Sequence, residues 1–138
     1  MNRNYVFTIT LYSRVKAADA DDGKERWIRT VLYNCFWKSQ IKTGFTDTAA
    51  VSGNVYTVRI PENPYYRPYA EFAKNPEGYF SVSPGDIVIL GECPEYITGK
   101  SGNTAAQVLN RYRPDAFQVT AFSDNTAFQI AKHYRLGG

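Results

Sequence analysis

The residues that could carry catalysis or bind a metal are few. The chain has a single histidine, His133, between Lys132 and Tyr134 in a predicted terminal strand. Nucleophilic catalysis needs an activated nucleophile with an oriented base, so a packing or surface role is the expectation for this histidine. A metal site needs several His, Cys or paired carboxylates at ligand spacing. We therefore expect no catalytic, cofactor-binding or metal-binding residues, and an enzyme is the least expected class.

Two further patterns resemble functional motifs but fit a structural role better. Asp86 follows Pro84-Gly85, and a carboxylate in that position most simply fixes a turn by accepting hydrogen bonds from nearby amides. Gly99-Lys100-Ser101 resembles the end of a phosphate-binding loop, but the first glycine of that motif would fall where Pro94 stands. We expect a turn at the first site and an ordinary loop at the second.

The two cysteines, Cys35 and Cys93, lack the spacing of a zinc site or a disulfide scaffold. Cys35 lies in a strand-like run, where a buried free thiol is the usual state. The remaining alternative for the pair is a disulfide.

The composition is typical of a globular protein, and its unusual feature is the aromatic content. The 138 residues include 11 Tyr and 8 Phe, with 43% hydrophobic residues and a net charge of +3. We expect residues 1–138 to form a single domain. The tyrosines allow two interpretations, a β-rich core with ordinary surface tyrosines or a protein–protein surface. A net charge of only +3 does not by itself indicate nucleic-acid binding.

The sequence shows no apolar run near the ~18 residues of a membrane span. Residues Met1 to Asn4 lead straight into an alternating pattern and do not resemble a signal peptide. We expect a protein made in the cytoplasm that does not bind membranes.

Two early segments have the pattern of strands. Residues Tyr5 to Tyr12 alternate, and an exposed loop is expected from Ser13 to Lys24. Trp27 to Lys38 is apolar on both faces, and its β-branched and aromatic content favours a strand over the competing helix. Apolar residues on both faces indicate a strand that is covered on both sides or lies at a subunit contact.

The middle of the chain combines a strand with a long irregular excursion. Turns are expected at Lys42-Thr43-Gly44 and at Ser52-Gly53-Asn54, followed by a strand from Val55 to Ile60. Proline and tyrosine dominate from Pro61 to Pro84, with one helical turn from Tyr69 to Lys74 that ends before Pro76. Long loops of this kind within a small domain often have a functional role.

The run from Pro84 to Gly91 is predicted to be the central strand, because four branched aliphatics follow a Pro-Gly-Asp turn. Thr104 and Gln107 have the spacing of a capping box for a helix that ends near Tyr112. Strands from Ala116 to Phe122 and from Thr126 to Leu136 complete the chain, and Phe80-Ser81-Val82 pairs briefly. The expected fold is mainly β: a small antiparallel β-barrel, SH3-like or related, with one short helix and a long Pro/Tyr-rich loop.

Several patches in a fixed order resemble the head-closure or head–tail connector proteins of long-tailed bacteriophages, a family of small neck proteins often labelled minor capsid proteins. The patches are Trp27, Val58-Arg59-Ile60-Pro61, Tyr65 to Tyr69, Pro84 to Gly91, Ile97-Thr98, Ser123-Asp124-Asn125 and the ending His133-Tyr134-Arg135-Leu136-Gly137-Gly138. Together they span nearly the whole chain.

This resemblance implies a structural virion protein of the phage neck. Such a protein forms a homo-oligomeric ring between the portal and the tail or adaptor proteins. The ring extends the channel for packaged DNA, without sequence-specific contact, and helps to retain the DNA. Subunit or portal contacts are expected in the Pro61 to Tyr79 excursion and the Val15 to Gly23 loop, at Tyr65, Tyr66, Arg67, Tyr69, Phe72, Tyr79, Asp19, Asp21 and Asp22.

Two alternatives remain open. One is a related position in the particle, as a tail completion or tail terminator protein. The other is a nucleic-acid- or peptide-binding module with an OB-like barrel. Its candidate basic residues are Arg59, Arg67, Lys74, Lys100, Arg111 and Arg113.

Overall fold

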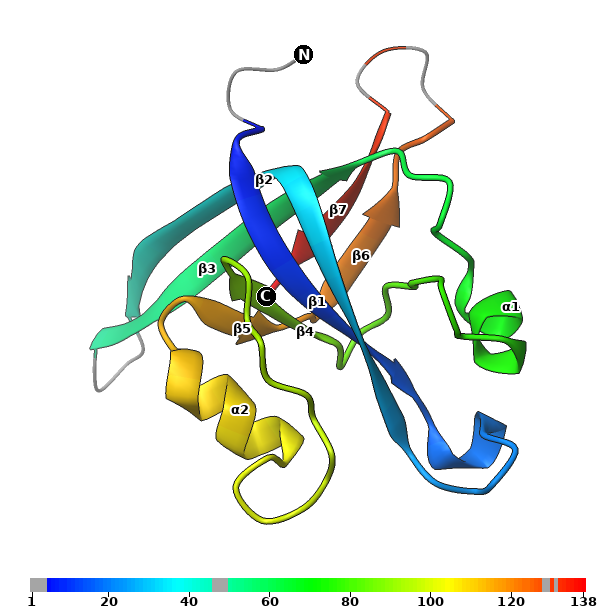
Figure 1. Ribbon diagram of the computed structural model, residues 1–138. Helices are drawn as coiled ribbons and strands as arrows, with labels where there is room; N and C mark the ends of the chain where they lie inside the picture. The colour runs from blue at the N-terminus through cyan, green and yellow to red at the C-terminus, as the bar shows by residue number, and fades with distance from the viewer. Residues whose placement is uncertain (1–4, 46–49, 128–129, 131) are drawn as a thin grey trace.

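The computed structural model describes residues 5–45, 50–127, 130 and 132–138. Figure 1 shows a strongly curled sheet with a short helix on either side of it. The strands are β1 (Phe7–Val15), β2 (Arg26–Phe45), β3 (Ala50–Pro61), β4 (Ile87–Leu90), β5 (Ala116–Gln118), β6 (Ala121–Asp124) and β7 (His133–Gly137). The helical segments are the 3-10 turn η1 (Ala17–Asp19), α1 (Tyr69–Lys74) and α2 (Ala105–Tyr112).

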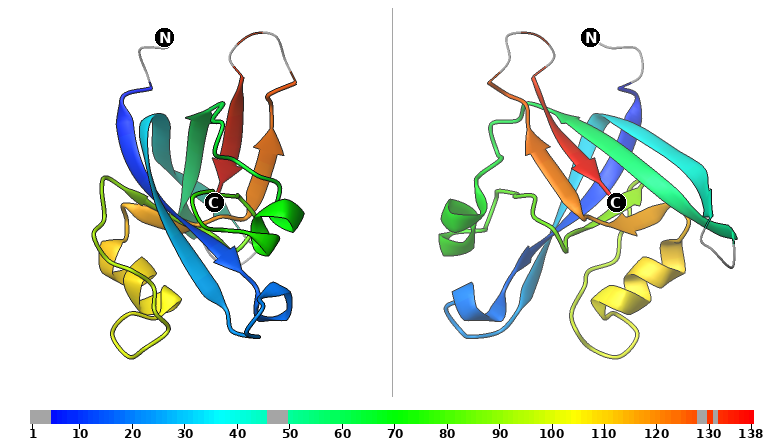
Figure 2. Two further views of the ribbon diagram at one scale, coloured as in Figure 1. Left: turned by 45° about the vertical axis from the view of Figure 1, so that its right-hand side comes forward. Right: turned by 180° about the vertical axis from the view of Figure 1, so that it is seen from behind.

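The described strands form one antiparallel sheet of seven strands in the order β5-β4-β1-β2-β3-β7-β6. Seen from behind in Figure 2, β3, β7 and β6 lie side by side across one face. The fold is therefore mainly antiparallel β and barrel-like, as predicted from the strand patterns.

The two edge strands, β5 and β6, are joined by only two residues, Val119 and Thr120. Val119 donates its N–H to Asp86 O at 2.7 Å, on the β4 side, and Thr120 donates to Gly137 O at 2.8 Å, on the β7 side. This segment was predicted as one strand, and it is divided because its partner changes at this point. The change of partner brings the two ends of the sheet together.

The side chains inside the curl form the larger of two apolar clusters. Ile9, Leu11, Val58 and Leu136 are fully buried there, and the ring of Trp37 packs 5.6 Å from that of Phe117. A second cluster lies beneath α2, where Val108 and Leu109 meet residues of β1 and β4. Polar Thr104 begins α2 with the predicted capping box, in which its side chain accepts from Gln107 N.

The structure corrects the predicted place of the Pro84 to Gly91 strand. β4 is buried on both faces, as expected, but it lies between β1 and β5, next to the edge of the sheet. The central strand is β2. The order of strands depends on pairings between distant segments, which the local sequence does not reveal.

Other predicted boundaries also change. Residues 42–44 and 52–54 were expected to be turns, and instead they lie in the β2–β3 ribbon, where residues 42 and 43 pair with residues 53 and 52. β1 runs on through Val15, so the exposed loop is shorter than predicted. Residues 80–82 contribute a single bridge, between Tyr66 and Phe80. The last strand begins at His133 and not at Thr126. Among the described residues, no helix is long and apolar enough to cross a membrane.

Candidate interaction surface

The excursion between β3 and β4 is held in a defined shape by its own backbone. Phe80 N donates to Tyr65 O at 3.1 Å, and Arg67 N donates to Phe80 O at 2.9 Å, so the two ends of the excursion run side by side. Between them α1 follows Pro68 and ends at Lys74, before Asn75-Pro76, as predicted. The excursion is therefore an ordered part of the molecule.

Two of the predicted contact residues, Tyr66 and Arg67, are largely used inside the chain. The ring centroid of Tyr66 lies 4.2 Å from that of Tyr134 on β7. Arg67 Nη1 donates to the carbonyl oxygens of Pro64 and Tyr66 at 2.7 Å, and its guanidinium lies 4.4 Å from the ring centroid of Tyr79. The contact of Tyr66 fixes the excursion to β7, and those of Arg67 hold parts of the excursion together.

The structure corrects the role expected for Phe72. Its side chain is fully buried, with 0% exposure, and it is the residue through which α1 packs onto the rest of the molecule. A buried ring cannot contact a neighbouring subunit. Phe72 therefore belongs to the structural support of the surface.

The two segments predicted to make contacts meet each other. Tyr69 on α1 donates its hydroxyl to Asp19 Oδ2 at 2.6 Å and accepts from Lys16 N at 3.0 Å. Burial and the hydrogen bond to Asp19 raise the pKa of Tyr69. Figure 1 shows α1 next to the η1 loop on one side of the molecule. The excursion and the loop thus form one continuous surface.

The other two aspartates of that loop differ in their contacts. Asp22 accepts from Lys24 N and from Arg26 Nη2, both at 3.0 Å, and these bonds lower the pKa of its carboxyl. Asp21 is exposed. Asp22 therefore shapes the loop, while Asp21 remains on its surface.

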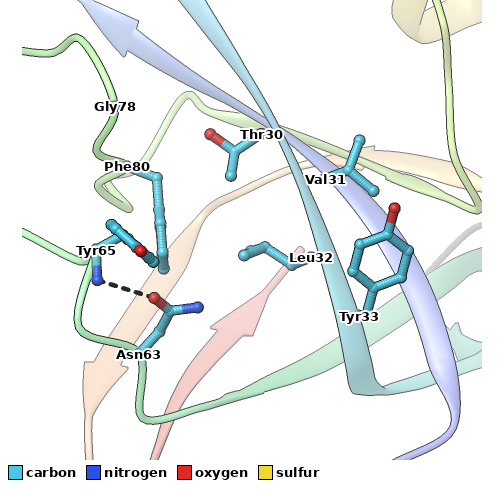
Figure 3. Close-up of a pocket in the computed structure, with 8 residues that line it drawn as sticks. All are labelled: Thr30, Val31, Leu32, Tyr33, Asn63, Tyr65, Gly78 and Phe80. Atoms are coloured by element: carbon cyan, nitrogen blue, oxygen red, sulfur yellow. Dashed lines mark hydrogen bonds between the residues drawn. The ribbon is translucent and has the colours of Figure 1, made fainter.

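A groove of about 460 Å³ separates the excursion from β2 (Figure 3). Its walls are residues of β2 on one side and of the excursion on the other: Thr30, Val31, Leu32, Tyr33, Asn63, Tyr65, Gly78 and Phe80. Figure 3 shows Thr30 and Leu32 turned toward the excursion, with Val31 and Tyr33 on the opposite face of the strand. We call this feature the β2 groove.

Two tyrosines beside the β2 groove are strongly exposed. Tyr33 and Tyr65 are 61% and 60% exposed, although both are large aromatic residues. Tyr65 was predicted as a contact residue, and its backbone N–H is fixed by Asn63 Oδ1 at 2.9 Å. Tyr33 was missed, and the signal for it was the apolar character of both faces of the Trp27 to Lys38 segment.

The β2 groove lies along an unpaired strand edge. Residues Arg26–Cys35 of β2 pair with β1, and residues Phe36–Phe45 pair with β3. The change of partner follows Asn34, which has a φ of 57°. Within the described residues no strand pairs with the opposite side of β2 before Phe36. The backbone of Thr30–Tyr33 therefore meets the groove with an open edge.

A second open edge lies on β3. Its residues Ala50–Val55 pair with β2 on one side. On the other side β7 begins its pairing at Thr57, and Tyr56 exchanges hydrogen bonds with Gly138 at 2.9 and 3.3 Å. No strand in the described part of the chain covers Ala50–Val55 on that side. The β2–β3 ribbon thus extends beyond the barrel, as Figure 1 shows.

Charged side chains lie elsewhere than in the β2 groove, since none of its lining residues carries a charge. Three of the basic residues considered for nucleic-acid binding make separate local contacts. Arg111 pairs with Glu95, Arg59 lies 5.1 Å from the ring of Phe36, and Arg67 binds its own backbone. Each of these three cations is therefore already engaged in a contact within the chain.

The two residues considered above for catalysis, Asp86 and His133, make contacts within the fold. Asp86 accepts from Arg14 N at 2.9 Å and from Ser83 N at 2.8 Å, which confirms its predicted role in fixing the turn. Burial raises its pKa to about 7, against the effect of these two hydrogen bonds. His133 Nε2 lies 3.2 Å from Asn125 Nδ2 in the last hairpin.

Both cysteines, Cys35 and Cys93, are buried and free, so the alternative of a disulfide is wrong. Burial raises the pKa of the Cys35 thiol to about 12. Among the described residues, no group of three or more His, Cys, Asp or Glu is arranged to hold a metal ion.

Comparison with known proteins gives one match. No curated protein and no solved structure resembles this chain closely enough to be matched. The model of a family of unknown function, DUF6751, matches residues 6–138. Since the match covers nearly the whole chain, the protein belongs to the DUF6751 family.

Proposed function

We propose that the protein is a structural subunit of a phage neck, which assembles as a ring between the portal and the tail and extends the channel for packaged DNA. The ordered patches from Trp27 to Gly138 support this proposal by their resemblance to head-closure and connector proteins. The barrel-like antiparallel fold agrees with the fold that the resemblance implies.

One observation carries the proposal, namely the candidate contact surface on one side of the barrel. The excursion and the η1 loop are joined there by Tyr69 and Asp19, and the uncharged β2 groove runs beside them. Ordered loops with exposed aromatic side chains are typical of protein–protein interfaces. A ring subunit needs such a surface for its neighbours and for the proteins above and below it.

A tail completion or terminator protein would use the same surface, and it remains the nearest alternative. A nucleic-acid-binding barrel is the alternative from another class. That module would need converging cations, whereas Arg59, Arg67 and Arg111 are engaged in separate contacts. The arrangement of these residues favours the structural role.

Light scattering after size exclusion, together with DNA binding at several salt concentrations, separates the two classes. For a neck subunit we expect assembly into a discrete oligomer and weak DNA binding. For a nucleic-acid module the expected result is a monomer whose DNA affinity falls steeply as salt rises. A monomer that binds single-stranded DNA tightly at low salt would overturn the proposal.

A further inference from the structure

We infer that copies of this protein join by strand addition: the open edge of β3 at Ala50–Val55 in one copy pairs with the open edge of β2 at Thr30–Tyr33 in the next. The inference rests on the proposed ring function and names the contact that would build the ring. It assigns the β2 groove to a segment of the same chain.

The β2 edge lacks the residue types that usually prevent a strand edge from pairing with another chain. Open edges in soluble proteins are usually protected by proline, by inward-pointing charges or by a covering loop. The nearest loop here is the excursion, and the β2 groove separates it from the edge. Thr30–Tyr33 contains neither proline nor a charged residue, and two of its four residues are β-branched. The neighbouring cation Arg29 is engaged elsewhere, because its Nε donates to Cys93 O at 2.6 Å.

The β2 groove has room for an added strand beside this edge. Neighbouring strands lie about 4.8 Å apart. The groove of about 460 Å³ lies between β2 and the wall formed by Asn63, Tyr65 and Gly78. An added strand would pair with the backbone of β2 and cover part of Tyr33 and Tyr65, which are now about 60% exposed. The high exposure of these two side chains in the single chain is therefore expected to decrease when copies assemble.

The β3 edge matches the groove in charge. The sequence of this segment, Ala50-Val51-Ser52-Gly53-Asn54-Val55, contains no charged residue. Placing a charge in an uncharged groove costs desolvation free energy that no partner offsets. A segment without charged residues, such as Ala50–Val55, avoids this cost in the β2 groove.

The positions of the two edges suit a repeating assembly. Figure 1 places the β2–β3 ribbon and the excursion on opposite sides of the molecule. A contact between two different patches is heterologous, and repeating it gives a ring when the rotation closes. Each copy would use its ribbon toward one neighbour and its groove toward the other.

A mixing experiment with two variants tests the contact. Tyr33→Glu places a charge at the β2 groove, and Val55→Lys places one on the β3 edge. The control for the first is Tyr96→Glu, because Tyr96 is equally exposed at 61% but lies outside the groove. The control for the second is Thr57→Lys, because Thr57 is already paired with β7. Circular dichroism and thermal melting verify that each variant is folded.

Analytical ultracentrifugation then measures the mass, and so the oligomeric state, of each variant and of the mixture. Wild type and both controls should form the same discrete oligomer, and Tyr33→Glu and Val55→Lys should each be monomeric. Mixing these two variants should give a 1:1 dimer that does not grow, because each supplies the edge that the other retains intact.

Other outcomes overturn the inference in distinguishable ways. If Tyr33→Glu and Val55→Lys assemble like wild type, the strand contact is wrong and the ring proposal stands. If both variants are monomeric and the mixture also remains monomeric, the contact joins other surfaces. If wild type is monomeric at every concentration, the self-assembled ring fails as well. A monomer whose groove binds an added uncharged peptide would assign the β2 edge to a different polypeptide.

Discussion

Asp86 joins two segments through both oxygens of its carboxylate. Oδ1 accepts from Arg14 N on β1, and Oδ2 accepts from Ser83 N at the end of the excursion. Gly85, just before it, has a φ of 101°, which a residue with a side chain rarely adopts. The turn therefore depends on the residue types Gly and Asp at these two positions, as expected from the sequence.

The buried carboxyl of Asp86 predicts a dependence of stability on pH. Burial raises its pKa from 3.8 in the unfolded chain to about 7 in the folded protein. The folded state therefore holds the proton more tightly, and the free energy of unfolding falls as pH rises from about 4 to about 7. The difference between the two pKa values corresponds to at most about 4 kcal/mol.

The measurement is urea unfolding between pH 4 and pH 8 for wild type and for Asp86→Asn, which has no titrating group. The stability of wild type relative to the variant should decrease with rising pH and become constant above about pH 7. A relative stability that rises over this range would show that the two backbone hydrogen bonds outweigh burial.

For single helices, patterns among neighbouring residues predict the observed structure correctly. The short helix from Tyr69 to Lys74 was predicted with its observed bounds, because Pro68 and Asn75-Pro76 limit it on both sides. The capping box of α2 was also confirmed, because it needs only residues three positions apart. Such elements are set by neighbours in the sequence, so a single sequence suffices to find them.

The missed elements are those that depend on distant partners. Residues 42–44 and 52–54 are rich in turn-forming types, yet both triplets form strand because β2 and β3 pair along their whole length here. The sequence indicated the excursion and Tyr65 as part of a contact surface. It could not indicate that the excursion would lie beside Thr30–Tyr33 and form a groove there.

The capping box of α2 allows a test at the same scale. Thr104→Ala removes the acceptor for Gln107 N, whose distance to Thr104 Oγ1 is 3.3 Å. We expect a loss of about 1 kcal/mol in the free energy of unfolding. Thr104→Ser keeps the hydroxyl and should remain close to wild type in chemical denaturation. An equal loss in both variants would mean that the methyl group, and not the cap, stabilises the helix.

At the scale of the whole molecule, closure of the sheet depends on the short link between β5 and β6 and on the end of β7. Gly138 exchanges two backbone hydrogen bonds with Tyr56 on β3 and lies against Phe117 on β5. Closure therefore joins β5 to β7 and β3 through a glycine that leaves space for the aromatic ring. Sequence patterns predicted a barrel but not this junction.

Substitution at Gly138 tests the closure. A Cβ at this position would lie 2.6 Å from Gln118 O and closer still to the ring of Phe117. We expect Gly138→Ala to lower the free energy of unfolding by about 1–3 kcal/mol, because a packed junction must shift. Gly137→Ala is the matched control, since its Cβ would meet its nearest neighbour at an ordinary 3.7 Å. Equal thermal stability of both variants would show that the junction is loosely packed.

Electron microscopy of the purified chain is the most direct test of the proposal that this protein is a ring-forming subunit. We expect closed rings of uniform size with an open axial channel. Tyr33→Glu should abolish these rings, and Tyr96→Glu should not. Single compact particles at every protein concentration, with no rings in wild type, would contradict this proposal.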